Sequence, residues 1–145
     1  MASYEATVPS VRTQQETFDY LSRFSNTEDW DPSAESGRDL QDGGPVEVGS
    51  RFELDFKIGP RTTELRYEVT EYDSPRKVRL FCDAGLFTSD DTIEVAADGK
   101  GSKVTYTAII KLKGPLGLLD PIMQLGFNRA GKQAANGLRE TLTRQ

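Results

Sequence analysis

The sequence contains no histidine and only one cysteine among its 145 residues. Without histidine, Ser-His-Asp and Cys-His catalytic groups and histidine-based metal sites are excluded. Cys82 has no second cysteine to pair with, and its alternating segment predicts that it faces inward as a small core residue. The aspartates show no spacing that would bind calcium. We therefore predict neither a metal site nor a cofactor, and the single cysteine favours a cytoplasmic location.

Long apolar runs and an excess of basic residues are also missing. The longest apolar window, residues 116–127, includes Asp120 and Gln124 and falls short of the roughly 20 residues that span a bilayer. Residues 1–18 lack the apolar centre of a secretory signal. The net charge is −5, with 18 Lys and Arg against 23 Asp and Glu, which disfavours binding to nucleic acid phosphates. These features predict one globular domain over residues 1–145, without a membrane span and without nucleic acid as a partner.

Two helical segments are expected near the beginning of the chain. Thr13 and Glu16 have the spacing of a capping box ahead of an apolar pattern, which predicts a helix within residues 11–24. A second, short helical turn is expected after Asn26 or Thr27, because the Asp31-Pro32 pair ends any helix there.

The middle of the chain alternates between apolar and charged residues, which is typical of β-strands. Residues 51–58 place Phe52, Leu54, Phe56 and Ile58 on one face, and Gly59-Pro60 then separates this strand from the next one as a hairpin. Together with other short segments, the pattern predicts seven antiparallel strands, at about residues 4–8, 34–41, 51–58, 61–72, 77–84, 86–97 and 102–113.

A long helix is expected at the end of the chain, with Asp120 as its N-cap and Pro121 at its first position. The inward stripe of this helix consists of Met123, Phe127, Ala130, Ala134, Leu138 and Leu142. Gly126 and Gly137 add to the small residues along the stripe. Small residues on a buried face have two interpretations: either the helix lies close against the sheet, or it bridges a space that side chains leave open.

The order of these elements resembles the helix-grip fold of the SRPBCC superfamily, which includes polyketide cyclases, START lipid-transfer domains and birch-pollen allergens. The segments that carry the resemblance are TVPSVRTQQETFDYLSRFSNTEDWDP, VEVGSRFEL, DGKGSKVTY and LKGPLGLLDPIMQLGF. They are similar to small bacterial proteins described as polyketide cyclase/dehydrase and lipid-transport proteins. The resemblance implies an α+β fold in which a seven-stranded curved antiparallel sheet wraps around the C-terminal helix, with two short helices after the first strand. It also implies an apolar cavity between the sheet and that helix.

The strand alternation selects candidate residues for the wall of this cavity. Inward-facing positions give Phe52, Leu54, Phe56, Leu65, Tyr67, Leu80, Phe87 and Tyr106, and the last helix adds Met123 and Phe127. Trp30 is included because the resemblance implies an aromatic residue near the cavity or its rim. The alternation alone does not separate cavity wall from ordinary core.

A carboxylate is predicted to lie in the apolar wall. Extending the alternation back from Val95 and Ile93 places Asp91 and Ser89 on the inward face. Burial without a cationic partner raises the pKa of a carboxyl group, so Asp91 is a candidate general acid or base, or an anchor for a ligand. Tyr67 and Tyr106 are candidates to act with it. A β-bulge at residues 89–91 is the alternative, because it would turn Asp91 toward solvent.

Three functions remain open at this point. The favoured one is binding, and with it transport, of a hydrophobic small molecule such as a lipid or polyketide. The second is a cyclase or dehydratase type of enzyme, working without histidine or metal, in which Asp91 or the tyrosines move protons. The third is an interaction module whose cavity is filled by side chains. The sequence does not define the oligomeric state.

Overall fold

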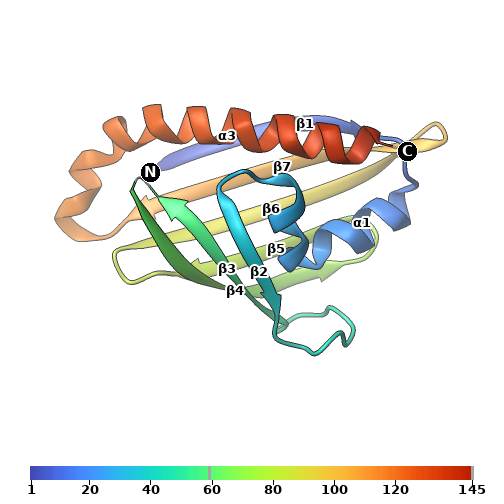
Figure 1. Ribbon diagram of the computed structural model, residues 1–145, viewed down its shortest axis with the longest axis horizontal. Coiled ribbons are helices and arrows are strands. Elements are labelled where there is room, and N and C mark those ends of the chain that lie inside the picture. Colours follow the sequence, from blue (N-terminus) through green and yellow to red (C-terminus); the bar gives the residue numbers. More distant parts are fainter. Residues whose placement is uncertain (59, 145) are drawn as a thin grey trace.

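The computed structural model describes residues 1–58 and 60–144 and contains one antiparallel sheet wrapped around a long helix (Figure 1). The strands follow the order β1-β7-β6-β5-β4-β3-β2 across the sheet. Their bounds are β1 Ala2–Ser10, β2 Ala34–Asp39, β3 Arg51–Ile58, β4 Arg61–Asp73, β5 Lys77–Asp83, β6 Phe87–Asp98 and β7 Gly101–Leu112. The helices are α1 Gln14–Ser22, η1 Phe24–Asn26, α2 Thr27–Trp30, η2 Gly114–Leu119 and α3 Asp120–Thr143. The predicted α+β helix-grip fold is confirmed.

Helix α1 begins at the predicted capping box. The Thr13 hydroxyl accepts a hydrogen bond from the Glu16 amide, and the Glu16 carboxylate accepts one from the Thr13 amide, each at 3.2 Å. Phe18 and Leu21 lie on the buried face of the helix. The helix ends at Ser22, and Phe24 packs into the core from η1 instead.

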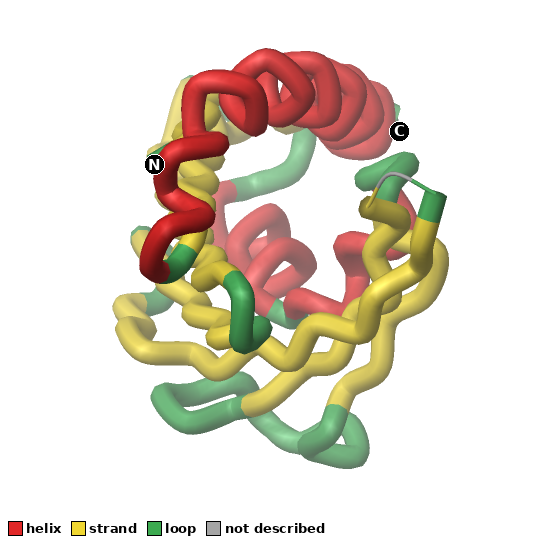
Figure 2. The backbone as a smooth tube through the Cα atoms, turned by 90° about the vertical axis from the view of Figure 1, so that its left-hand side faces the viewer, coloured by secondary structure: helices red, strands yellow, loops and turns green. Residues whose placement is uncertain are grey.

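The sheet curves beneath α3, as Figure 2 shows from the end where that helix begins. Strand β4 contains a register shift between Val69 and Glu71. Because of this shift, Val69 and Tyr72, three residues apart, both contribute to the core, and Tyr72 pairs with Val78 of β5.

Both interpretations of the small residues on α3 are correct, each for one half of the helix. A Cβ atom added to Gly137 would lie 1.9 Å from the Trp30 carbonyl oxygen, and one added to Gly131 would lie 2.4 Å from the Tyr4 ring. These glycines therefore allow close packing. A Cβ atom added to Gly126 would meet nothing within 4 Å, so the helix is not packed closely there.

The predicted start of α3 was wrong by one residue, because Asp120 is the first residue of the helix and Leu119 is its N-cap. Pro121 lies in the first turn, where a missing amide hydrogen costs nothing. The side chain of Asp120 lies outside the described part of the chain, and so does Gly59 of the predicted hairpin turn.

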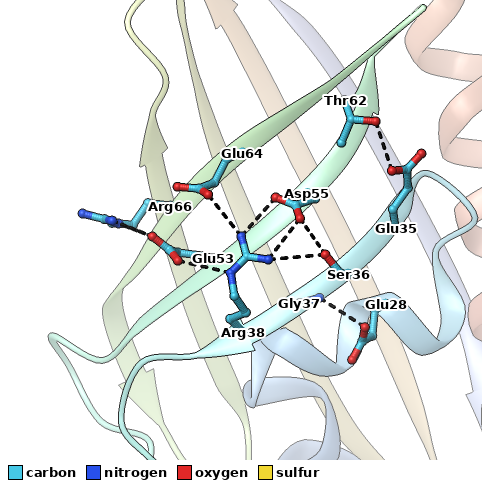
Figure 3. A network of polar contacts seen from close by, with 10 residues as sticks. All are labelled: Glu28, Glu35, Ser36, Gly37, Arg38, Glu53, Asp55, Thr62, Glu64 and Arg66. Carbon is cyan, nitrogen blue, oxygen red and sulfur yellow. Dashed lines mark hydrogen bonds and ion pairs between the residues drawn. The ribbon is translucent and has the colours of Figure 1, made fainter.

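The edge strand β2 is attached to its neighbours by ion pairs on the outer face of the sheet (Figure 3). The Arg38 guanidinium contacts Glu53 at 3.2 Å, Asp55 at 3.0 Å and Glu64 at 3.3 Å. Its hydrogen bonds lower the pKa of Asp55 to about 2. Glu53 also pairs with Arg66 of β4, so the network spans three strands.

Within residues 1–58 and 60–144, no helix combines the length and apolar character needed to cross a bilayer.

Candidate functional site

A cavity of about 590 Å³ lies between α3 and the concave face of the sheet. Its volume falls within the range of about 300–1,000 Å³ that is usual for small-molecule sites. Most of the predicted wall residues line it: Trp30, Phe56, Leu65, Tyr67, Phe87, Ser89, Asp91, Tyr106, Met123 and Phe127. The wall is mainly apolar, with polar groups on β4, β6 and β7, in the segment after α2, and at Lys57 of β3.

Three predicted wall residues do not line the cavity. Phe52, Leu54 and Leu80 face inward, but each is fully buried. They belong to the hydrophobic core that also contains residues of α1 and η1. The alternation correctly predicted their face of the sheet, whereas α1 and η1 determine which part of that face becomes core.

The polar groups of the wall form a hydrogen-bonded chain centred on Asp91. Ser89 donates to one carboxylate oxygen of Asp91 at 2.9 Å, and Tyr106 donates to the other. Tyr67 in turn donates to the Ser89 hydroxyl at 3.1 Å. Strands β5 and β6 pair without a register shift, with Leu80 opposite Asp91, so the alternative of a bulge was wrong. Asp91 is only 3% exposed.

Burial is the main influence on the pKa values of these hydrogen-bonded side chains. It raises the pKa of Asp91 to about 6, although hydrogen bonds from Tyr106 and Ser89 act in the opposite direction. Burial also raises the pKa of both Tyr67 and Tyr106 well above the ordinary value. The two phenols are therefore neutral donors at physiological pH, whereas the Asp91 carboxyl group is mainly ionised there.

Asp31, which is half-buried, provides a second carboxyl group in the wall that was not predicted from the sequence. It lines the cavity directly after α2, and burial raises its pKa to about 6. One of its oxygens accepts a hydrogen bond from the Ser33 amide at 2.9 Å. In the sequence it stood out only as the residue before Pro32, a helix-ending signal. Its place beside Trp30, which was assigned to the cavity, was the available clue.

Trp30, the last residue of α2, contacts Tyr106 of the hydrogen-bonded group around Asp91. It is 4% exposed, and its ring meets that of Tyr106 edge-on with centroids 5.6 Å apart. The backbone of Trp30 is also the contact for Gly137 of α3. Trp30 therefore holds α3 against the same region in which Asp31 and Asp91 lie.

The cavity opens near η2 and the first turns of α3. Leu119 and Ile122 both line it, yet they are 49% and 70% exposed, which places them at a rim. Leu138, toward the other end of α3, also lines it and is only 1% exposed. Neither residue was predicted to line the wall, because Leu119 precedes α3 and carries no strand alternation, and Ile122 lies in the first turn of α3 outside the predicted inward stripe.

The other reactive groups considered from the sequence offer little chemistry. Cys82 is buried, and its burial raises the pKa of the thiol to about 11, so the thiolate is scarce at neutral pH. In the described part of the chain, no three metal-ligating side chains lie close enough to hold an ion.

Comparison with known proteins identifies similar sequences and folds. The sequence profile of the family described as "Polyketide cyclase / dehydrase and lipid transport" matches residues 1–143. A START superfamily protein from Mycobacterium smegmatis superposes with a TM-score of 0.78 at 15% identity, covering 98% of this chain and 97% of that chain. A Thermus thermophilus protein gives a TM-score of 0.74 at 18% identity, covering 97% and 95%.

A third solved structure, Ara h 8.0201, superposes with a TM-score of 0.65 at 13% identity, covering 97% of this chain and 96% of that one. At such identities the structural likeness concerns the fold alone. No curated protein matches the chain.

Proposed function

Because the chain belongs to the polyketide cyclase/dehydrase and lipid transport family of the SRPBCC superfamily, we propose a binding function for it. The ligand is a hydrophobic small molecule, and it binds between α3 and the sheet. The observation that carries the proposal is the apolar cavity of about 590 Å³. The proposed binding residues are the predicted ones that line it together with Asp31.

The size of the cavity supports an occupant. At about 24 cal/mol per Å³, a dry void of this volume would cost on the order of 10 kcal/mol, comparable to the total stability of a domain. Water is a poor substitute, because each buried water needs two to four polar partners and the wall offers them mainly near Asp91 and Asp31. The same volume argues against an interaction module with a filled cavity.

The proposal can be tested by blocking the cavity with a single side chain. Ala134 lines the cavity, whereas its neighbour Gln133 is exposed on the outer side of α3. We expect Ala134→Phe to weaken binding of the neutral apolar fluorophore N-phenylnaphthylamine by about tenfold or more, because the ring occupies the guest's space.

Gln133→Phe is the matched control and should bind the fluorophore as the wild type does. Native mass spectrometry of the purified protein, before and after organic extraction, would show whether a small molecule accompanies it. Equal fluorophore binding by Ala134→Phe and wild type would contradict the proposed site.

A cyclase or dehydratase activity is a second candidate, favoured by the chain of Asp91, Tyr106, Ser89 and Tyr67. A carboxyl group with a pKa of about 6 is suited to take a proton from a substrate carbon, and neutral phenols can donate to a developing enolate oxygen. We expect Asp91→Asn to remove turnover of a poly-β-ketone substrate while apolar guests still bind. Unchanged turnover would remove Asp91 from the catalytic role.

A further inference from the structure

The wall of the cavity carries two carboxyl groups, and no ion pair within the described part of the chain joins either of them to a cation. Its charged wall residues are Asp31, Asp91 and Lys57. Lys57 is exposed, and none of the ion pairs recorded for residues 1–58 and 60–144 joins it to either aspartate. Asp91 instead has only hydroxyl donors, from Ser89 and Tyr106. A carboxylate in an apolar site without a counter-ion is costly, and a ligand that supplies the positive charge removes that cost.

Both carboxyl groups keep free capacity to accept hydrogen bonds. A carboxylate has about four lone-pair sites, and Asp91 uses one on each oxygen. Asp31 accepts one bond on a single oxygen, from the Ser33 amide. The two groups lie on the same part of the wall, because Asp31 follows Trp30, whose ring contacts that of Tyr106, the donor to Asp91. A single donor group in this part of the cavity can therefore reach a region bounded by both.

The other groups that face Asp91 add no positive charge. They are Tyr106 from β7, Tyr67 from β4 and the Cys82 thiol from β5. Asp90 and its partner Arg79 lie on the opposite face of the sheet, where they pair at 2.6 Å. Strand β1 contributes Tyr4 to the wall, and the wall residues of α3 are apolar or small.

Building on the proposed binding function, we infer that the preferred guest is an apolar molecule with a protonated amine at one end, held by Asp31 and Asp91. The apolar body lies along Phe56, Phe87 and Met123, toward the open rim. A neutral hydroxyl could make the hydrogen bonds without neutralising the charge, and a carboxylate would add a third negative charge.

The inference can be tested with three guests that share one decyl chain: decylamine, decanol and decanoate. Each would displace N-phenylnaphthylamine from the wild-type protein. At about pH 7.5 we expect decylamine to bind about tenfold more tightly than decanol, and decanoate to bind more weakly than decanol. The preference for decylamine should shrink toward about pH 5, because Asp31 and Asp91 become protonated while the alkylammonium stays charged.

Substitutions of the aspartates test which residues cause the preference for decylamine. Asp31→Asn combined with Asp91→Asn should reduce the preference for decylamine to about twofold or less while decanol still binds, which also shows that the variant is folded. Asp90→Asn changes the outward neighbour of Asp91 and should keep the full preference. The wild-type series stays decisive even if the double variant does not fold.

The outcomes separate this inference from the proposed function. Equal affinity for the three guests would overturn the amine preference and leave apolar binding intact. Tighter binding of decanoate would also overturn it and would assign the head-group site to Lys57 at the rim. Failure of all three guests, and of the fluorophore itself, would overturn the proposed binding function.

Discussion

At neutral pH the charge of the buried Asp91 lowers the free energy of unfolding of the protein. Its pKa is raised from the ordinary 3.8 to about 6, chiefly by burial. The folded state therefore binds a proton more tightly than the unfolded state does, and stability falls as the pH rises from about 4 to about 6 and stays level above that. At neutral pH the difference corresponds to about 3 kcal/mol. Asp31 acts in the same direction.

This cost predicts that Asp91→Asn stabilises the protein at neutral pH. The amide keeps the size of the carboxyl group and carries no charge. We expect the free energy of unfolding to increase by about 1–3 kcal/mol at about pH 7.5 and by about a third of that amount at about pH 4.5, because part of the difference in proton binding is already present there. Urea unfolding across this range measures both values. A variant that is less stable than the wild type at the higher pH would show that hydrogen bonding, rather than desolvation, governs Asp91.

The two aspartates differ in how well the sequence predicts them. Asp91 lies within a strand, and strict alternation fixed the direction of its side chain because β6 pairs with β5 and β7 without a register shift. Asp31 lies between α2 and β2, where no period applies. Its burial depends on α2 packing against α3, a contact between distant parts of the chain.

At the scale of elements, α3 is attached along one half and open along the other. Gly137 touches the Trp30 backbone and Gly131 touches the Tyr4 ring, whereas Gly126 has no neighbour within reach of a Cβ atom. The attached half fixes the helix against α2 and β1. The open half lies over the cavity, and its first turns form the rim.

This difference predicts opposite effects for the same substitution at two positions of α3. Gly137→Ala places a methyl group against the Trp30 carbonyl and should destabilise the protein by about 1–3 kcal/mol. Gly126→Ala meets no obstacle and should stabilise it by about 0.5–1 kcal/mol through helix propensity. Urea unfolding of the two variants checks this. Equal effects at both positions would mean that α3 does not pack closely on Trp30.

The strands were easier to predict than the ends of α3. Amphipathic strands such as β3 carry their period in every residue, so their number and approximate bounds follow from the sequence. The beginning of α3 follows η2, whose segment Gly114–Leu119 is apolar without a period. The sequence analysis therefore placed the N-cap one residue too late and overlooked η2.

At the scale of the whole molecule, the N-terminal helices set the boundary between core and cavity. α1 and η1 contribute Phe18 and Phe24 to the same core as Phe52, Leu54 and Leu80. Phe56, further along β3, lines the cavity instead. Strand alternation describes one sheet face as uniform, so this division of the face could not be read from it.

The uneven attachment of α3 separates the half of the helix that packs closely on the rest of the fold from the half that faces open space. A side chain introduced at position 126 extends into free space, whereas one introduced at position 131 or 137 meets the Tyr4 ring or the Trp30 backbone. Larger side chains at position 126 can therefore fill part of the cavity without displacing the closely packed half of α3.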